Sequence, residues 1–263
     1  MPVRKNHKFL AILNVVGFLM VIIINALANI LPINNKTTGE LSDQYPNLFV
    51  PAGVTFSIWG LIYILLAGFV VFQLVSAFSS KYHDDFLSKI SSWFLVSCLA
   101  NSSWILAWHY EQVAISLTIM ILLLFSLIQI YRSLHHKKKE KENLGKIFWT
   151  KVPFSIYLGW ISIATIANVT ALLVNINFTG FGISEPQWAQ ALILAGIILS
   201  LIMMFKRQDI FYGLVVIWAY FGIYLKQNNS SYEGIVVVAV FGILLIAIGI
   251  ISQVIRKQLY FYR

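Results

Sequence analysis

The feature that most constrains the fold is a series of eight apolar stretches, none of which contains Asp, Glu, Lys or Arg. Each can cross the hydrocarbon core of a bilayer as an α-helix, because a helix satisfies its own backbone hydrogen bonds in lipid. The stretches are 9–31, 53–78, 91–109, 113–131, 152–174, 188–205, 210–225 and 234–255. We therefore predict an all-α polytopic membrane bundle of about eight transmembrane helices.

The basic residues predict how these helices are threaded through the bilayer. With the N-terminus in the cytoplasm, only Lys36 and Lys226 of the 19 lysines and arginines fall on the outer side. Cytoplasmic loops carry an excess of Lys and Arg, so this distribution predicts that both termini are cytoplasmic. It also explains the net charge of +9, which indicates contact with anionic lipid rather than with nucleic acid.

Composition excludes a soluble domain, because 59% of the residues are hydrophobic and only 11% are charged. Residues 1–28 resemble a secretory signal peptide that ends in Ala26-Leu27-Ala28. Their apolar stretch is longer than usual and contains Asn14, so we expect a retained helix. The Ile-, Lys- and Asn-rich composition, together with the predicted multi-pass topology, fits a bacterial cytoplasmic membrane better than an organelle membrane.

Neither the loops nor the single cysteine of the chain indicates a metal site or a disulfide. The outer loop 32–51 is the longest and is expected to form a cap rather than a strand. The cytoplasmic loop 132–151 contains a basic run from His135 to Lys141. We interpret this run as a topology anchor, since no further ligand accompanies its two histidines. Cys98 is the single cysteine, so a disulfide framework is excluded and no metal site is assigned.

Polar and aromatic residues recur at helical spacing in three predicted spans, which places each set on one helix face. The sets are Phe56, Trp59 and Tyr63 in the second span, Cys98, Asn101, Trp104 and Trp108 in the third, and Tyr157, Trp160, Ala164 and Asn168 in the fifth; Asn25 and Asn29 form an i, i+4 pair in the first. Asparagine in hydrocarbon needs hydrogen-bond partners, so Asn101 and Asn168 are expected to face the bundle interior. Such faces suit a flat, largely apolar ligand, and aromatic helix packing is the alternative interpretation.

Several classes of function are not indicated by the sequence. No Asp, Glu, Lys or Arg lies within a predicted span, whereas ion-coupled transporters place ionisable groups at membrane depth. The P-loop, GxSxG and HExxH patterns are also missing from the sequence. We therefore assign no catalytic residue, no enzymatic activity and no required cofactor.

The same three faces resemble the motifs of the TspO/MBR family, which comprises the tryptophan-rich sensory proteins and the mitochondrial translocator protein. The segment PAGVTFSIWGLIY, from Pro51 to Tyr63, resembles the family's second-helix signature. The stretch from Asn101 to Trp104 resembles its third-helix Asn-x-x-Trp pattern. The fifth-helix pattern is matched by Pro153, Tyr157, Trp160, Ala164 and Asn168. Three motifs in order on spans two, three and five support the resemblance.

The resemblance covers about residues 9–175. It implies a TspO/MBR-like five-helix transmembrane unit over 1–175 and a three-helix transmembrane extension over 176–263. It also implies a pocket for porphyrins such as protoporphyrin IX or haem, or for other hydrophobic molecules, with loop 32–51 as its lid. By motif position, the ligand-binding residues would be Pro51, Trp59, Tyr63, Asn101, Trp104, Trp108, Tyr157, Trp160 and Asn168.

Two residues and the added length depart from the family pattern. Ala52 replaces the second proline of the Pro-Pro turn, and Phe154 stands where tyrosine is usual. The three further spans would either cover the face through which five-helix members dimerise or alter the pocket, so a homodimer stays open. We predict an integral membrane protein that binds a porphyrin-like or other hydrophobic small molecule for sensing, sequestration or transport. The alternatives are a permease for a small organic solute and a non-catalytic membrane scaffold.

Overall fold

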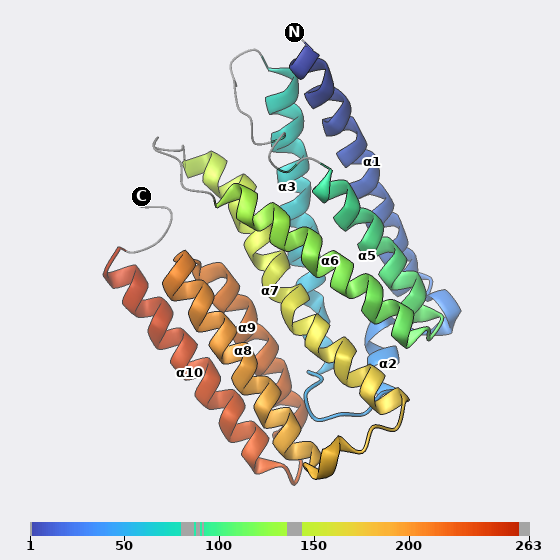
Figure 1. Cartoon of the computed structure of the whole chain (residues 1–263), viewed down its shortest axis with the longest axis vertical. Coiled ribbons are helices and arrows are strands. Elements are labelled where there is room, and N and C mark those ends of the chain that lie inside the picture. The colour runs from blue at the N-terminus through green and yellow to red at the C-terminus, as the bar shows by residue number, and fades with distance from the viewer. Residues whose placement is uncertain (1, 80–86, 88–89, 91, 136–143, 258–263) are drawn as a thin grey trace. The chain divides into compact units, whose positions relative to one another are not determined.

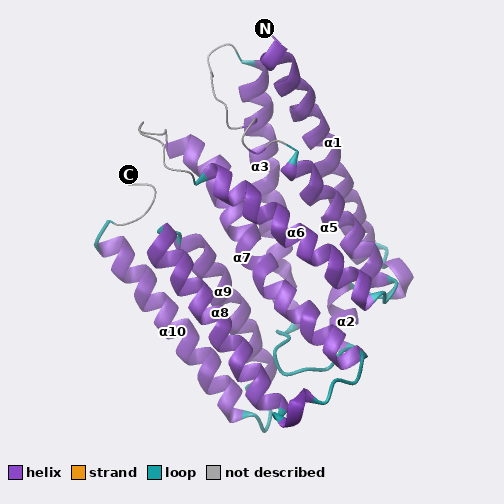
Figure 2. Cartoon of the chain, viewed as in Figure 1, coloured by secondary structure: helices purple, strands orange, loops and turns teal. Residues whose placement is uncertain are grey.

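The computed structural model describes residues 2–79, 87, 90, 92–135 and 144–257 (Figure 1). Helices account for nearly all regular structure in these ranges, and no strand occurs among them (Figure 2). The α-helices are α1 (Pro2–Ile30), α2 (Thr38–Asp43), α3 (Ile58–Phe78), α5 (Trp93–His109), α6 (Val113–Leu134), α7 (Leu144–Asn175), α8 (Glu185–Arg207), α9 (Ile210–Gln227) and α10 (Glu233–Ile255). Short 3₁₀-helices are η1 (Ile33–Asn35), η2 (Gly53–Ser57) and η3 (Gly180–Gly182). The predicted all-α class is confirmed.

Seven of the helical segments in the described residues are long and apolar enough to cross a membrane. The helix that corresponds to the third predicted span, α5, has 17 residues. This length falls at the lower end of the range for a transmembrane helix, about 17 to 25 residues. A polytopic helical membrane protein is therefore supported, while the crossing of α5 and the orientation of the bundle stay predictions.

Helix α7 is longer than the apolar stretch that predicted it. It contains 32 residues and begins at Leu144, whereas the predicted span begins at residue 152. Lys146 and Lys151 therefore lie within the helix. A charged residue is disfavoured in the hydrocarbon core of a bilayer, but lysine is a good helix former and does not end a helix. Pro153 lies inside α7. Transmembrane helices tolerate an internal proline when neighbouring groups form hydrogen bonds with the backbone carbonyl that the proline leaves without a donor.

Backbone and side-chain hydrogen bonds define the turn between α5 and α6 and the start of α9. The turn between α5 and α6 contains Glu111, which adopts a positive φ of 57°, and the Gln112 amide donates to the Ala107 carbonyl at 2.9 Å. At the start of α9, the Asp209 carboxylate accepts from the amides of Phe211 and Tyr212 at 3.1 and 3.3 Å. This side chain acts as an N-cap, which satisfies amides that have no partner within the helix.

Some sequence predictions concern residues outside the described ranges. The basic run after His135, up to Lys141, lies there, as do Lys81 and Lys89, which fall between the second and third predicted spans. The outer loop 32–51 is described and contains η1 and the short helix α2 rather than a strand.

The chain divides into two compact units, and the boundary within α7 follows Leu158. The first unit comprises residues 1–38 and 59–158, and the second comprises 39–58 and 159–263. The domain boundary predicted at residue 175 marks where the family resemblance ends. The division into compact units is a different criterion and does not test that boundary.

The first unit packs α1 against α5 and α5 against α6. Its core contains three buried phenylalanines, Phe69, Phe94 and Phe154, whose ring centroids lie 4.9 to 5.9 Å apart. A buried polar contact joins α1 to α3, where Asn14 donates its Nδ2 to Oε1 of Gln73 at 2.9 Å. Interhelical side-chain hydrogen bonds of this kind stabilise helix pairs in lipid.

The second unit contains the helices α8, α9 and α10, each packed against the other two. The fully buried Tyr220, on α9, donates its hydroxyl hydrogen to the Ile193 carbonyl of α8. Gln253, on α10, donates to the Met204 carbonyl of α8. These contacts give the Tyr220 hydroxyl and the Gln253 Nε2 a hydrogen-bond acceptor inside an otherwise apolar bundle.

Candidate ligand-binding site

A chain of side-chain hydrogen bonds joins three helices of the first unit. Asn25, on α1, donates its Nδ2 to Oδ1 of Asn101, on α5, at 2.8 Å. Asn101 donates its own Nδ2 to the hydroxyl oxygen of Tyr157, on α7, at 2.8 Å. All three residues are buried, so the amides have the partners that asparagine requires in hydrocarbon. The expectation that Asn101 faces the interior is confirmed.

Trp59 lies at the centre of an aromatic group around this chain. Its ring centroid is 5.5 Å from that of Tyr63, 6.2 Å from that of Trp104 and 5.9 Å from that of Tyr157. Trp104 stacks in turn on Trp108, with centroids 6.2 Å apart and an interplanar angle of 16°. These separations are those of favourable aromatic pairs. We define the aromatic–amide cluster as Asn25, Trp59, Tyr63, Asn101, Trp104, Trp108 and Tyr157.

The cluster contains a polar group whose hydrogen-bonding capacity is unused. The hydroxyl oxygen of Tyr63 is buried and makes no hydrogen bond with any described residue. Leaving such a group without a partner costs roughly 1 to 3 kcal/mol. A polar edge of a bound molecule, or a water, would recover this free energy.

Asn25 is the member of the cluster that the predicted binding set lacks. The sequence signal for it was the i, i+4 pair with Asn29, and the structure shows that the two residues act differently. Asn25 reaches across to Asn101, whereas Asn29 donates its Nδ2 to the Asn25 carbonyl of its own helix at 2.9 Å. Helical spacing cannot distinguish an interhelical bond from a local one.

The first part of the outer loop is attached to the end of α5 through His109, which is fully buried. The His109 Nδ1 lies 3.0 Å from the Ile33 carbonyl oxygen, and its Nε2 lies 3.2 Å from Oγ1 of Thr38. A carbonyl only accepts, so in the neutral ring Nδ1 carries the hydrogen and Nε2 accepts from the Thr38 hydroxyl. Trp108 also donates its Nε1 to the Thr38 carbonyl at 3.3 Å. This part of the loop is therefore fixed beside the cluster.

The other predicted site residues lie in the second unit. Pro51 precedes Ala52, whose amide donates to the Gly222 carbonyl of α9 at 3.0 Å. Trp160 is buried on α7 and packs edge-on against Phe56, with ring centroids 5.9 Å apart. Asn168 is buried on the same helix. The structure thus gathers Trp59, Tyr63, Asn101, Trp104, Trp108 and Tyr157 in one cluster and does not assign Pro51, Trp160 or Asn168 to it.

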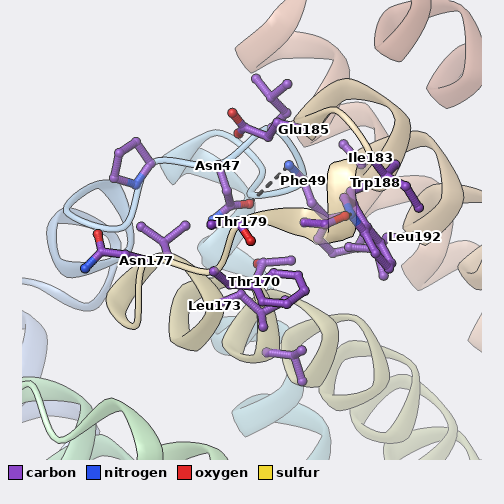
Figure 3. A pocket seen from close by; sticks show the side chains of 17 residues that line it. Asn47, Phe49, Thr170, Leu173, Asn177, Thr179, Ile183, Glu185, Trp188 and Leu192 are labelled. Carbon is purple, nitrogen blue, oxygen red and sulfur yellow. Dashed lines mark hydrogen bonds between the residues drawn. The ribbon is translucent and has the colours of Figure 1, made fainter.

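The second unit contains a cavity of about 440 Å³ that no predicted site residue lines. Figure 3 shows the residues around it, which come from loop 46–49, the end of α7, the turn 178–183 and the start of α8. Most of its walls are apolar, with Phe49, Leu173, Trp188 and Leu192 among them. Neither helical spacing nor a motif indicates this cavity, and the only sequence signal for it was the predicted outer loop 32–51, which contributes residues 46–49.

A model of the TSPO-like protein family matches residues 11–252, which is most of the chain. The chain belongs to the TSPO-like protein family. The match continues past residue 175, so α8, α9 and most of α10 lie inside the matched stretch. No curated protein and no solved structure matches the chain.

The aromatic–amide cluster limits the ligand chemistry that this TSPO-like protein offers in its first unit. Indole and phenol rings supply faces for stacking, and the amides and hydroxyls supply a few directed hydrogen bonds. No group of three or more His, Cys, Asp or Glu side chains that could hold a metal occurs in the described residues. The rings, amides and hydroxyls of the cluster are of the kind that line pockets for flat, largely apolar molecules with polar edges.

Proposed function

We propose that this TSPO-like protein binds a porphyrin-like or other hydrophobic small molecule among its membrane helices, and that it senses, sequesters or moves that molecule. The observation that carries the proposal is the position of Trp59, which contacts Tyr63, Trp104 and Tyr157 beside the Asn25–Asn101–Tyr157 hydrogen bonds. The site that we propose is the aromatic–amide cluster, in a multi-pass protein of the bacterial cytoplasmic membrane.

The chemistry of a porphyrin suits this cluster. A flat conjugated ring gains from offset stacking and edge contacts with indole rings, each worth about 0.5 to 1.5 kcal/mol beyond the area buried. Its polar groups would meet the Tyr63 hydroxyl, which makes no hydrogen bond with the described residues. Entry of the ligand would require the rings to separate, since Trp59, Trp104 and Trp108 are buried against one another.

The proposal is tested by titrating the purified protein in detergent with protoporphyrin IX and following the quenching of tryptophan fluorescence. Wild type is compared with Trp104→Phe and Asn101→Ala. Trp93→Phe is the matched control, because Trp93 is on the same helix but contacts Phe125 rather than the cluster. We expect saturable quenching that the two cluster variants weaken by roughly tenfold, as for losing about 1.4 kcal/mol, while Trp93→Phe binds as wild type.

The other outcomes would assign a different function. Absence of saturable quenching in folded protein would remove porphyrin as the ligand. Flux of a small solute in proteoliposomes without porphyrin binding would favour the permease. If Trp104→Phe lowers the melting temperature and no ligand saturates, the aromatic faces serve only as packing and the scaffold remains.

A further inference from the structure

The cavity of the second unit has mostly apolar walls, and three of the polar side chains that line it are already engaged in hydrogen bonds. Asn47 accepts from the amides of Phe49 and Val50 through Oδ1 and donates its Nδ2 to the Tyr45 carbonyl at 2.8 Å. Trp188 donates its Nε1 to the Gly180 carbonyl at 3.0 Å. Thr170 donates its hydroxyl to the Ala167 carbonyl. A bound molecule would therefore meet mainly hydrocarbon and aromatic surface.

The cavity has one charged lining residue, Glu185, the first residue of α8. Its side chain is exposed and makes no ion pair with any described residue. Two other acids in the predicted outer loops differ, since Glu111 pairs with Lys36 and Asp43 pairs with Lys226, both at 2.7 Å. The field at this cavity therefore includes the negative charge of a carboxylate that has no counter-ion among the described residues, offset in part by the N-terminal dipole of α8.

From this combination we propose that the cavity binds a lipophilic organic cation. Its volume of about 440 Å³ lies within the usual range of small-molecule pockets, about 300 to 1,000 Å³. The apolar body of the ligand occupies the space between α7 and α8, and its positive charge lies toward Glu185. The rings of Phe49, Phe178 and Trp188 line the same cavity and attract a cation through their faces.

This site is distinct from the aromatic–amide cluster and goes beyond the proposed porphyrin binding. The cluster supplies neutral amides and hydroxyls and includes no acidic side chain, so it lacks the carboxylate that favours a cation in the cavity. The cavity has a carboxylate and most of its uncommitted surface is apolar. The two sites are therefore expected to select ligands of different charge.

The test uses two probes of nearly equal shape and opposite charge, tetraphenylphosphonium and tetraphenylborate. Each is titrated calorimetrically into the full-length protein in a non-ionic detergent, and the signal from empty micelles is subtracted. We expect saturable binding of the phosphonium and at least tenfold weaker binding of the borate. Glu185→Gln should weaken the phosphonium by about fivefold to tenfold, as for the loss of one nearby charge close to solvent.

Glu233→Gln is the matched control, because Glu233 is likewise the exposed first residue of a helix, α10, and does not line the cavity. It should bind the phosphonium as wild type does. Thr179→Trp places a large ring in the exposed turn that lines the cavity. It should abolish phosphonium binding and leave porphyrin quenching at the cluster unchanged, which separates failure of this proposal from failure of the first.

Three results would overturn the proposal. They are equal affinity for the phosphonium and the borate, unchanged phosphonium affinity in Glu185→Gln, and unchanged binding in Thr179→Trp. If Thr179→Trp is poorly folded by its melting temperature, Leu173→Trp fills the same cavity from α7 and is scored by the same criterion.

Discussion

The side-chain amide of Asn101 donates a 2.8 Å hydrogen bond to the hydroxyl oxygen of Tyr157, 56 residues further along the chain. The bond links α5 to α7, and the same asparagine accepts from Asn25 of α1. A single amide therefore joins three helices of the first unit. Asn25 and Tyr157 are buried as well. If the Asn101 amide is removed, both therefore lose a hydrogen-bond partner that water cannot replace.

The first prediction measures this contact by a double-mutant cycle. Asn101→Ala should lower the free energy of unfolding by about 1 to 3 kcal/mol, since Asn25 and Tyr157 each lose a buried partner. The coupling with Tyr157→Phe should be about 0.6 to 1.7 kcal/mol, as measured for hydrogen bonds in lipid. Unfolding in mixed micelles gives both values. Asn175→Ala, at the exposed end of α7, is the control, and a coupling of zero would mean that the bond contributes nothing.

The second prediction concerns close packing around Gly222. An added Cβ would overlap Oγ1 of Thr55 and lie 2.8 Å from Cβ of Pro51. Gly222→Ala should therefore cost about 1 to 3 kcal/mol through overpacking. Gly60→Ala is the matched variant, because a Cβ there meets nothing within 4 Å, and it should be neutral or stabilise α3 by up to about 1 kcal/mol. Thermal melts compare the two, and equal shifts would contradict the packing at Gly222.

The third prediction tests the attachment of the outer loop to α5. His109→Ala removes the contacts to the Ile33 carbonyl and the Thr38 hydroxyl, so segment 33–38 should open more readily. Amide hydrogen exchange in that segment should accelerate by roughly tenfold or more, which corresponds to about 1.4 kcal/mol. Thr38→Val, which loses only one of the contacts, should have a smaller effect. Exchange at wild-type rates in His109→Ala would show that the loop is held by other contacts.

The fourth prediction tests orientation in the membrane. Cys98 is buried, so single new cysteines can be labelled against a low background. A membrane-impermeant maleimide should label Thr179→Cys in intact cells, and it should label Lys206→Cys only after the membrane is permeabilised. Both positions are exposed and lie toward opposite ends of α8, Thr179 in the turn before it and Lys206 in its last turn. The reverse pattern would place both termini outside and would contradict the distribution of lysine and arginine.

Some of the candidate site followed from sequence because helical spacing is a local property. Asn101, Trp104 and Trp108 share a face of α5, and this face is buried. Periodicity does not state which other face it meets. The cavity between loop 46–49 and the turn 178–183 could not be predicted, because segments more than 100 residues apart form it and no spacing rule connects them.

The sequence by itself determined the class of the protein. Uncharged apolar stretches must become helices in a bilayer, because lipid offers no partner for an exposed backbone, and the motifs on three of them indicated the family that the comparison shows. The tertiary structure decided which polar groups found partners. Asn25 and Asn101 are 76 residues apart, and only the packing of α1 against α5 makes them neighbours. The sequence places Tyr63 on the aromatic face of the second span and gives Glu185 no role. Three-dimensional packing leaves the Tyr63 hydroxyl without a hydrogen bond and Glu185 without a counter-ion among the described residues.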